Sequence, residues 1–160
     1  MKHLPLLKEA QKSCPAGDYC HTELIRYRAY RENYGKSSLT AGAAAQRAWF
    51  ETFPVYVYDC DRIAGNRRGN FVTEYDETEL RAARKTLASY GSLHFGTNSD
   101  HFAPAYGRFL ADGIRGTLAR IDASLDAHRD DAAKTEFLTA QRLVTEGFQT
   151  FVGRDAEAAR

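Results

Sequence analysis

The chain has 160 residues and nearly balanced charge, with 22 lysines and arginines against 21 aspartates and glutamates. This length is typical of a single domain, and a net charge of +1 argues against a protein that binds nucleic acid through bulk positive charge. Only 31 residues are Leu, Ile, Val or Phe, whereas 24 are alanine. The core is therefore expected to be poor in large aliphatic side chains and to complete its burial against another surface.

Two helices are expected in the first third of the chain. Asp18 is the expected N-cap of the first, which runs to the residue before Gly35. Thr40 can cap the second, Ala41 to Phe53, whose alanines favour a helix and which Pro54 stops. One side of the first helix is expected to carry Leu24, Tyr27, Arg31 and Tyr34. The tyrosines of this helix are expected to be buried.

An extended segment and a third helix follow. Val55 to Tyr58 alternates β-branched and aromatic residues, which is typical of a strand, but the run is too short to hold a sheet alone. After an irregular, glycine-bearing segment, Asp76 and Glu79 begin the third helix in a pattern like a capping box. Its expected buried stripe is Leu80, Ala83, Leu87 and Tyr90.

The last two expected helices carry the clearest amphipathic patterns. Pro104 is favourable in the first turn of one of these helices. Gly113 and Gly116 interrupt its pattern, and each lowers the stability of the helix by about 1 kcal/mol, which is explained if another backbone packs close to them. Asp131 or the aspartate before it caps the final helix, residues 155–160 are expected to fray, and the aromatic side chains of this helix are expected to be exposed. The expected stripes are Phe109, Leu110, Ile114, Leu118, Ile121 and Leu125, then Phe137, Gln141, Val144, Phe148 and Phe151.

The sequence predicts a cytoplasmic protein. It has no run of roughly 18 apolar residues, which excludes a membrane span, and Met1 to Ala10 lacks the apolar core and cleavage site of a signal peptide. Cys14, Cys20 and Cys60 share no metal-ligand spacing, so they are expected to be reduced thiols.

Two loops carry residues that could bind a ligand. His101 precedes the helix expected at Pro104, where it could bind an oxygen-bearing ligand or simply hydrogen-bond to the backbone. The loop Gly65 to Asn70, which contains Asn66 and Arg67, could form a backbone nest for phosphate. It is neither a dinucleotide fingerprint nor a Walker loop, and an arginine in a glycine turn more often ties the turn to a neighbouring group. The residues alone indicate a helical domain without an assembled active site.

Three colinear segments carry a family resemblance: Arg26 to Gly35, rich in arginine and tyrosine; Phe53 to Arg67, where a proline precedes an extended run and a Gly-Asn-Arg end; and Asp100 to Tyr106. Together they resemble the glycyl radical enzymes, in the pyruvate formate-lyase-like branch that includes glycerol and diol dehydratases. The resemblance covers roughly residues 18–153, within one partial domain over residues 1–160. Asp100 and Ala105 stand where that family has glycine and an acidic residue, so the substrate class stays open.

The resemblance implies a fold and a chemistry. The family's fold is a ten-stranded β/α-barrel wrapped by helices, of which the N-terminal region supplies mostly helices. The implied class is therefore mainly α, with one short extended segment near residues 55–58. In the family, a radical S-adenosylmethionine activase creates a glycyl radical, which takes hydrogen from a cysteine whose thiyl then abstracts hydrogen from the substrate. His101 would then line the substrate pocket, and Asn66 and Arg67 would order the adjoining loop.

Neither radical residue is identified in this chain. No cysteine lies in a G-C-x-E-like loop, and Tyr34-Gly35 and Tyr90-Gly91 reverse the order found in the family's R-V-x-G-Y motif. The leading hypothesis is a truncated, split or fragmentary N-terminal part of an anaerobic formate C-acetyltransferase or diol dehydratase-like lyase. Such a chain would lack a cofactor or metal of its own, would not be catalytic alone, and would bind the barrel or a neighbouring chain but no nucleic acid or membrane. The rival is an independent helical protein-interaction module.

Overall fold

The computed structural model describes residues 20–55, 57, 76–89 and 105–160, which form five helices. No strand occurs among these residues, so the prediction of a mainly α fold is confirmed. Val55 and Val57 belong to no helix or strand, and the other two residues of the expected extended run lie outside the described residues. The helices are α2 (Cys20–Glu32), α3 (Ser38–Thr52), α4 (Glu77–Ser89), α5 (Tyr106–Ala127) and α6 (Ala132–Ala158).

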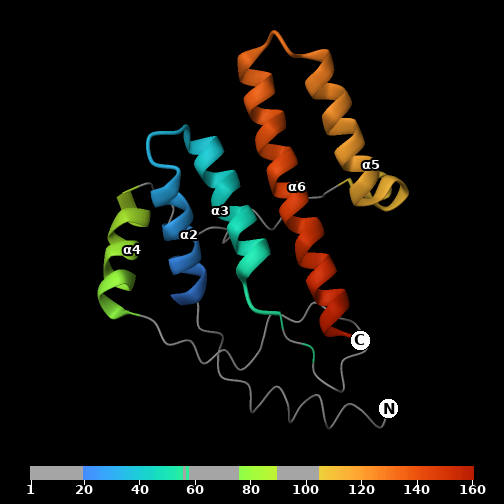
Figure 1. Ribbon diagram of the computed structural model, residues 1–160. Coiled ribbons are helices and arrows are strands. Elements are labelled where there is room, and N and C mark those ends of the chain that lie inside the picture. The colour runs from blue at the N-terminus through green and yellow to red at the C-terminus, as the bar shows by residue number, and fades with distance from the viewer. Residues whose placement is uncertain (1–19, 56, 58–75, 90–104) are drawn as a thin grey trace.

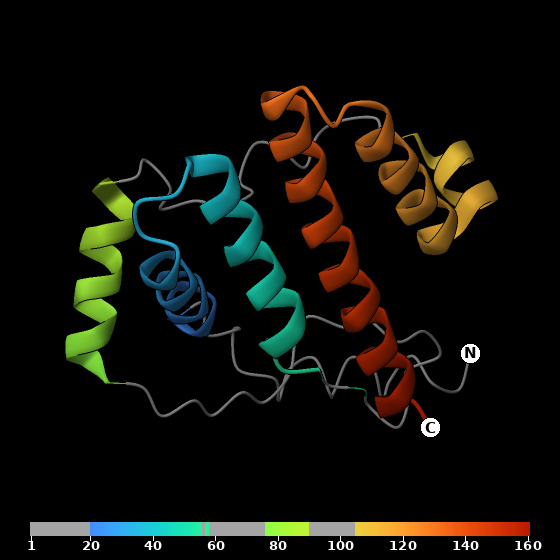
Figure 2. The same cartoon turned by 45° about the horizontal axis from the view of Figure 1, so that its top comes forward.

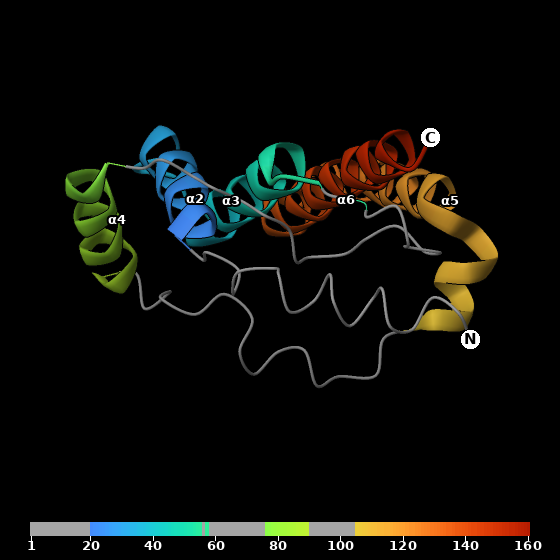
Figure 3. The ribbon, with the colours of Figure 1, turned by 90° about the horizontal axis from the view of Figure 1, so that it is seen from below.

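The five helices lie side by side in a single layer (Figures 1 and 3). Their order across the layer is α4, α2, α3, α6, α5, and each of them contacts only its immediate neighbours in this row. Figure 2 shows α6 between α3 and α5, although α5 precedes α6 in the chain. Globular domains usually pack two layers around one core, whereas these described helices bury themselves against one another along their flanks.

The buried core of this layer consists mostly of small side chains and tyrosines. Ala45 and Ala83 are completely buried, but no large side chain among the described residues is. The expectation of a core poor in large aliphatic residues is therefore confirmed. The main cluster joins α2, α3 and α4 and contains Leu24, Tyr27, Ala29, Tyr30, Ala41, Ala45, Leu80 and Ala83.

The α2–α3 connection differs from its prediction at one cap. Gly35 has φ +84°, a left-handed conformation that favours glycine, and it reverses the chain after α2 as expected. The N-cap of α3 is Ser37 and not Thr40: the Ser37 hydroxyl accepts a hydrogen bond from the Thr40 N–H at 3.1 Å. Because the chain has already turned at Gly35, the helix can start one turn earlier. It ends at Thr52, before Pro54, as predicted.

The burial predicted for one side of α2 is correct only over the first turns of this helix. Leu24 and Tyr27 are buried, whereas Arg31 is exposed and Tyr34 is 82% exposed. The helix ends at Glu32, so its periodicity does not extend to Tyr34.

Two crossing ion pairs hold α4 on α2. Arg28 donates Nε and Nη2 to the two carboxylate oxygens of Glu79 at 2.9 and 2.7 Å, and Arg84 donates to Glu23 at 2.8 Å. Asp76 accepts a hydrogen bond from the N–H of Thr78 at the start of α4, as an N-terminal cap should. Glu79 reaches α2 instead of turning back to the helix start, so the expected capping box is only half formed.

Aromatic rings join α6 to α3. The Trp49 and Phe151 ring centroids are 5.6 Å apart, and those of Phe50 and Phe148 are 5.5 Å apart. Phe148 and Phe151 are half-buried, so the expectation that the aromatic residues of the last helix are exposed is wrong for both, although Phe137 is 50% exposed. Both rings pack against α3, a contact that the sequence pattern within α6 could not reveal.

The end of α6 is ordered by α3. Arg154 donates two hydrogen bonds to the carbonyl oxygens of Phe50 and Phe53, at 3.0 and 2.8 Å, and so satisfies the C-terminal end of α3. Asp155 is buried, and α6 continues to Ala158. The predicted fraying is therefore wrong for residues 155–158, which continue the helix next to the bonds of Arg154 to α3. The predicted cap of α6 is confirmed as Asp131.

Candidate functional site

The residues proposed from the sequence to face a substrate lie outside the described residues. This holds for His101, Asn66 and Arg67, and for the cysteines Cys14 and Cys60. Their roles remain predictions. Among the described residues, no group of three or more His, Cys, Asp or Glu side chains could hold a metal ion. None of the described helices is both long and apolar enough to cross a bilayer.

The most unusual local structure in the described chain is a bend inside α5. Gly113 has φ +63° and ψ −172°, a region of backbone space that is essentially restricted to glycine. The arm before the bend points away from the rest of the helix row (Figure 3). The sequence suggested that Gly113 lets another backbone pack close, but its function is to bend its own helix.

Side chains on both arms fix the bend. Asp112 and Arg120 form an ion pair of 2.7 Å across it, and the Thr117 hydroxyl donates to the Gly113 carbonyl at 2.8 Å. A Cβ at Gly116 would lie 2.8 Å from the Asp112 Cβ, so this glycine leaves the space that the Asp112 side chain occupies. The angle between the arms therefore depends on several residues.

A hollow of about 300 Å³ opens to solvent between the two arms. Among the described residues, its wall combines aromatic rings with guanidinium groups and contains no carboxylate, histidine or cysteine. Such a wall can bind but carries no pair of groups for acid–base or nucleophilic catalysis. The lining residues are Ala105, Tyr106, Arg108, Phe109, Thr117 and Arg120.

The arm before the bend exposes its apolar side chains. Tyr106 is 66% and Leu110 is 78% exposed, while Phe109 keeps one contact with α6, with its ring centroid 6.4 Å from that of Phe148. Leu110 was predicted to share a buried stripe with Ile121, which is buried. That prediction is wrong for Leu110 because the bend interrupts the helical period between them.

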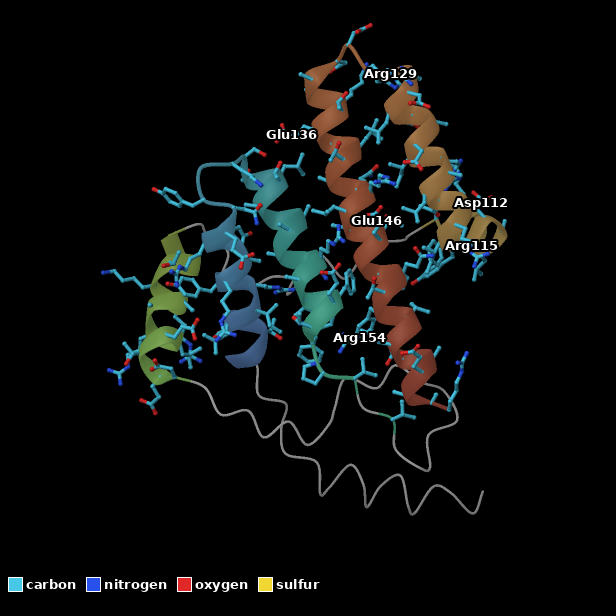
Figure 4. All side chains as sticks on the ribbon, in the orientation of Figure 1. Asp112, Arg115, Arg129, Glu136, Glu146 and Arg154 are labelled. Atoms are coloured by element: carbon cyan, nitrogen blue, oxygen red, sulfur yellow. The ribbon has the colours of Figure 1, made fainter. Side chains whose placement is uncertain are left out.

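Positive charge accompanies these apolar residues. Between Ala105 and Arg120 the sequence has three arginines and one aspartate. Arg120 pairs with Asp112, whereas Arg108 and Arg115 are exposed and have no acidic partner among the described residues. Figure 4 shows Asp112 and Arg115 together at the bend. Other arginines on α5 and α6 form ion pairs with carboxylates, as Arg142 does with Asp122 at 2.8 Å.

The described carboxylates with shifted pKa values do not line the hollow. Burial raises the pKa of Asp155, while hydrogen bonds from the Arg28 guanidinium lower the pKa of Glu79. The Ser37 hydroxyl, at the start of α3, lowers the pKa of Glu136 on α6. Glu79 and Glu136 thus accept hydrogen bonds from neighbouring helices or their caps, and Asp155 is buried.

A comparison with protein-family models decides the family. Residues 69–160, more than half of the chain, match the model described as pyruvate formate lyase-like. The chain belongs to the pyruvate formate lyase-like family. The resemblance found in the sequence is thereby confirmed, and with it a relationship to the glycyl radical enzymes. No curated protein and no solved structure matches the chain.

The family match includes the whole of α4, α5 and α6, and hence the bend. The helices α2 and α3 precede the matched span but are part of the same row. Ion pairs and aromatic contacts join them to the matched helices, with Arg28 bound to Glu79 and Trp49 beside Phe151. The pyruvate formate lyase-like region and the two preceding helices thus form one contiguous layer.

Proposed function

We propose that this chain is the N-terminal helical part of a glycyl radical enzyme, of the formate C-acetyltransferase or diol dehydratase-like class. Its role is to assemble with the barrel that carries the thiyl cysteine and the radical glycine, and it does not catalyse the reaction alone. The observation that carries this proposal is the family match over residues 69–160 in a sequence whose cysteines and Tyr-Gly pairs fit neither radical motif.

The character of the described surface supports an assembly role. The described residues that line the hollow include no acid–base or nucleophilic pair, and Tyr106 and Leu110 on the same arm of α5 are exposed. The buried residues of the helix row include many alanines, and no large side chain of the described residues is fully buried. A chain of this kind gains stability from a further surface that covers its exposed apolar residues.

The proposed chemistry belongs to the assembly. When the activase has formed the glycyl radical on the barrel, that radical supplies hydrogen-atom abstraction through the thiyl cysteine. The helices of this chain would exclude water and oxygen from one side of the barrel. We propose that His101 lines the substrate pocket and that Asn66 and Arg67 order the adjoining loop. This chemistry fits a cytoplasmic protein of an anaerobic cell.

A reconstitution experiment tests the proposal. The purified chain is mixed with the polypeptide of the same organism that carries both G-C-x-E-like and R-V-x-G-Y motifs, and the mixture is analysed by size-exclusion chromatography with light scattering. A stable complex of one copy of each is expected. The absence of any complex, together with cooperative unfolding of a highly stable monomer, would instead favour the independent helical interaction module.

A further inference from the structure

We propose that the bend of α5 is the surface that docks the barrel-bearing polypeptide, and that it receives an acidic segment with one large apolar side chain. The inference rests on the proposed function and says which surface of this chain contacts the other polypeptide. We call this surface the elbow and define it by Tyr106, Arg108, Phe109, Leu110 and Arg115.

The shape of the elbow suits a protruding side chain. The glycine conformation at Gly113 and the 2.7 Å ion pair between Asp112 and Arg120 hold the two arms at an angle in the free chain. The hollow of about 300 Å³ between them is large enough for one aromatic or aliphatic anchor. Anchors that enter such preformed pockets contribute most of the affinity at protein interfaces.

The apolar residues of the elbow form a continuous edge. Tyr106 and Leu110 are four residues apart on one arm, so they lie on the same face of the helix. Both are more than half exposed, although aromatic and aliphatic side chains of this size are normally covered. A partner that covers this edge removes it from water.

The charge of the elbow selects an acidic partner. The single aspartate at the bend is already bound to Arg120, which leaves Arg108 and Arg115 without acidic partners among the described residues. Carboxylates of the partner can accept hydrogen bonds from both guanidinium groups. A second copy of the elbow would bring the same positive charge against it, so self-association through this surface is disfavoured. The segment received is therefore acidic and belongs to the other polypeptide.

Four single substitutions of exposed residues test the inference. Tyr106→Ser and Arg108→Gln alter the elbow, while Tyr34→Ser in the α2–α3 connection and Arg81→Gln on α4 are controls of the same chemistry elsewhere. All four side chains are exposed, so the four variants are expected to fold. Each elbow substitution is expected to weaken the Kd for the barrel-bearing polypeptide roughly tenfold, with the controls within about twofold.

The outcomes separate the inference from the proposed function. If the unaltered chain binds no barrel-bearing polypeptide, the proposed function fails and the inference fails with it. If the complex forms but the elbow and control variants bind equally well, only the inference is overturned. Concentration-dependent self-association that Tyr106→Ser abolishes would identify a second copy as the occupant and would also overturn it. Circular dichroism of each variant confirms that the helix content is unchanged.

Discussion

Asp112 and Arg120 lie on opposite arms of α5 and meet at 2.7 Å across the bend at Gly113. Two side chains eight positions apart in a straight helix would be separated by a little over two turns, or roughly 12 Å along the axis. The bend brings them together, and Arg120 also lines the hollow between the arms. The local backbone and the surface that we assign to docking are thus parts of one feature.

The contribution of this ion pair is measurable with a double-mutant cycle. Both side chains are partly exposed, so we expect a coupling free energy of about 0.5 kcal/mol between Asp112→Asn and Arg120→Gln, which decreases as salt is added. Urea unfolding of the four chains gives the value. A coupling that is absent at low salt would show that the pair does not hold the bend.

Gly113→Ala tests the bend itself. An alanine is strained at φ +63° and ψ −172°, so the free energy of unfolding is expected to fall by about 2 kcal/mol. Gly153→Ala is the control, because that glycine in α6 has open space around its Cβ position, and its substitution should raise stability by up to about 1 kcal/mol. Equal effects of the two substitutions in urea unfolding would mean that the bend is not required for the folded state.

The contact between α3 and α6 is tested by Gly147→Ala. A Cβ on Gly147 would lie 3.0 Å from the Arg47 Cα, and because backbone cannot give way as a side chain does, the helices must separate. We expect a loss of about 2 kcal/mol in the free energy of unfolding, compared with the same Gly153→Ala control. A variant as stable as the parent would contradict the close approach of these helices.

Asp155 gives the stability of the chain a specific pH dependence. Burial raises its pKa above the ordinary value of 3.8, so the folded chain binds this proton more tightly than the unfolded chain. Ionised Asp155 therefore reduces stability near neutral pH, and this loss is recovered as the pH falls through the raised pKa. Asp155→Asn is expected to raise the Tm at about pH 7 and to differ less from the parent at about pH 4. Glu157→Gln, an exposed change on the same turn of α6, should leave Tm unchanged at both.

Local patterns predicted what depends on neighbouring residues in the chain. The cap at Asp131 and the end of α3 before Pro54 follow from backbone chemistry within a few residues, and both are confirmed. The first helix was expected to run to the residue before Gly35, whereas α2 ends at Glu32 and Gly35 turns the chain after it. The cap at Thr40 failed because Ser37, three residues earlier, offers the same hydroxyl.

Features set by distant residues could not be predicted in this way. The sequence shows a glycine at 147 but not that Arg47 approaches it, and the ring contact between Phe50 and Phe148 joins residues far apart in the chain. The exposure of Leu110 depends on which conformation Gly113 adopts. The family was predicted from three short motifs, of which only Asp100 to Tyr106 lies within the matched residues 69–160, whereas the elbow required the bend to be seen.

The most direct test of the central claim is substrate turnover by the barrel-bearing polypeptide, activated anaerobically by its activase with and without this chain. The account predicts that turnover appears only when both polypeptides are present and that the chain alone gives none. Full turnover by the barrel-bearing polypeptide in the absence of this chain would contradict it.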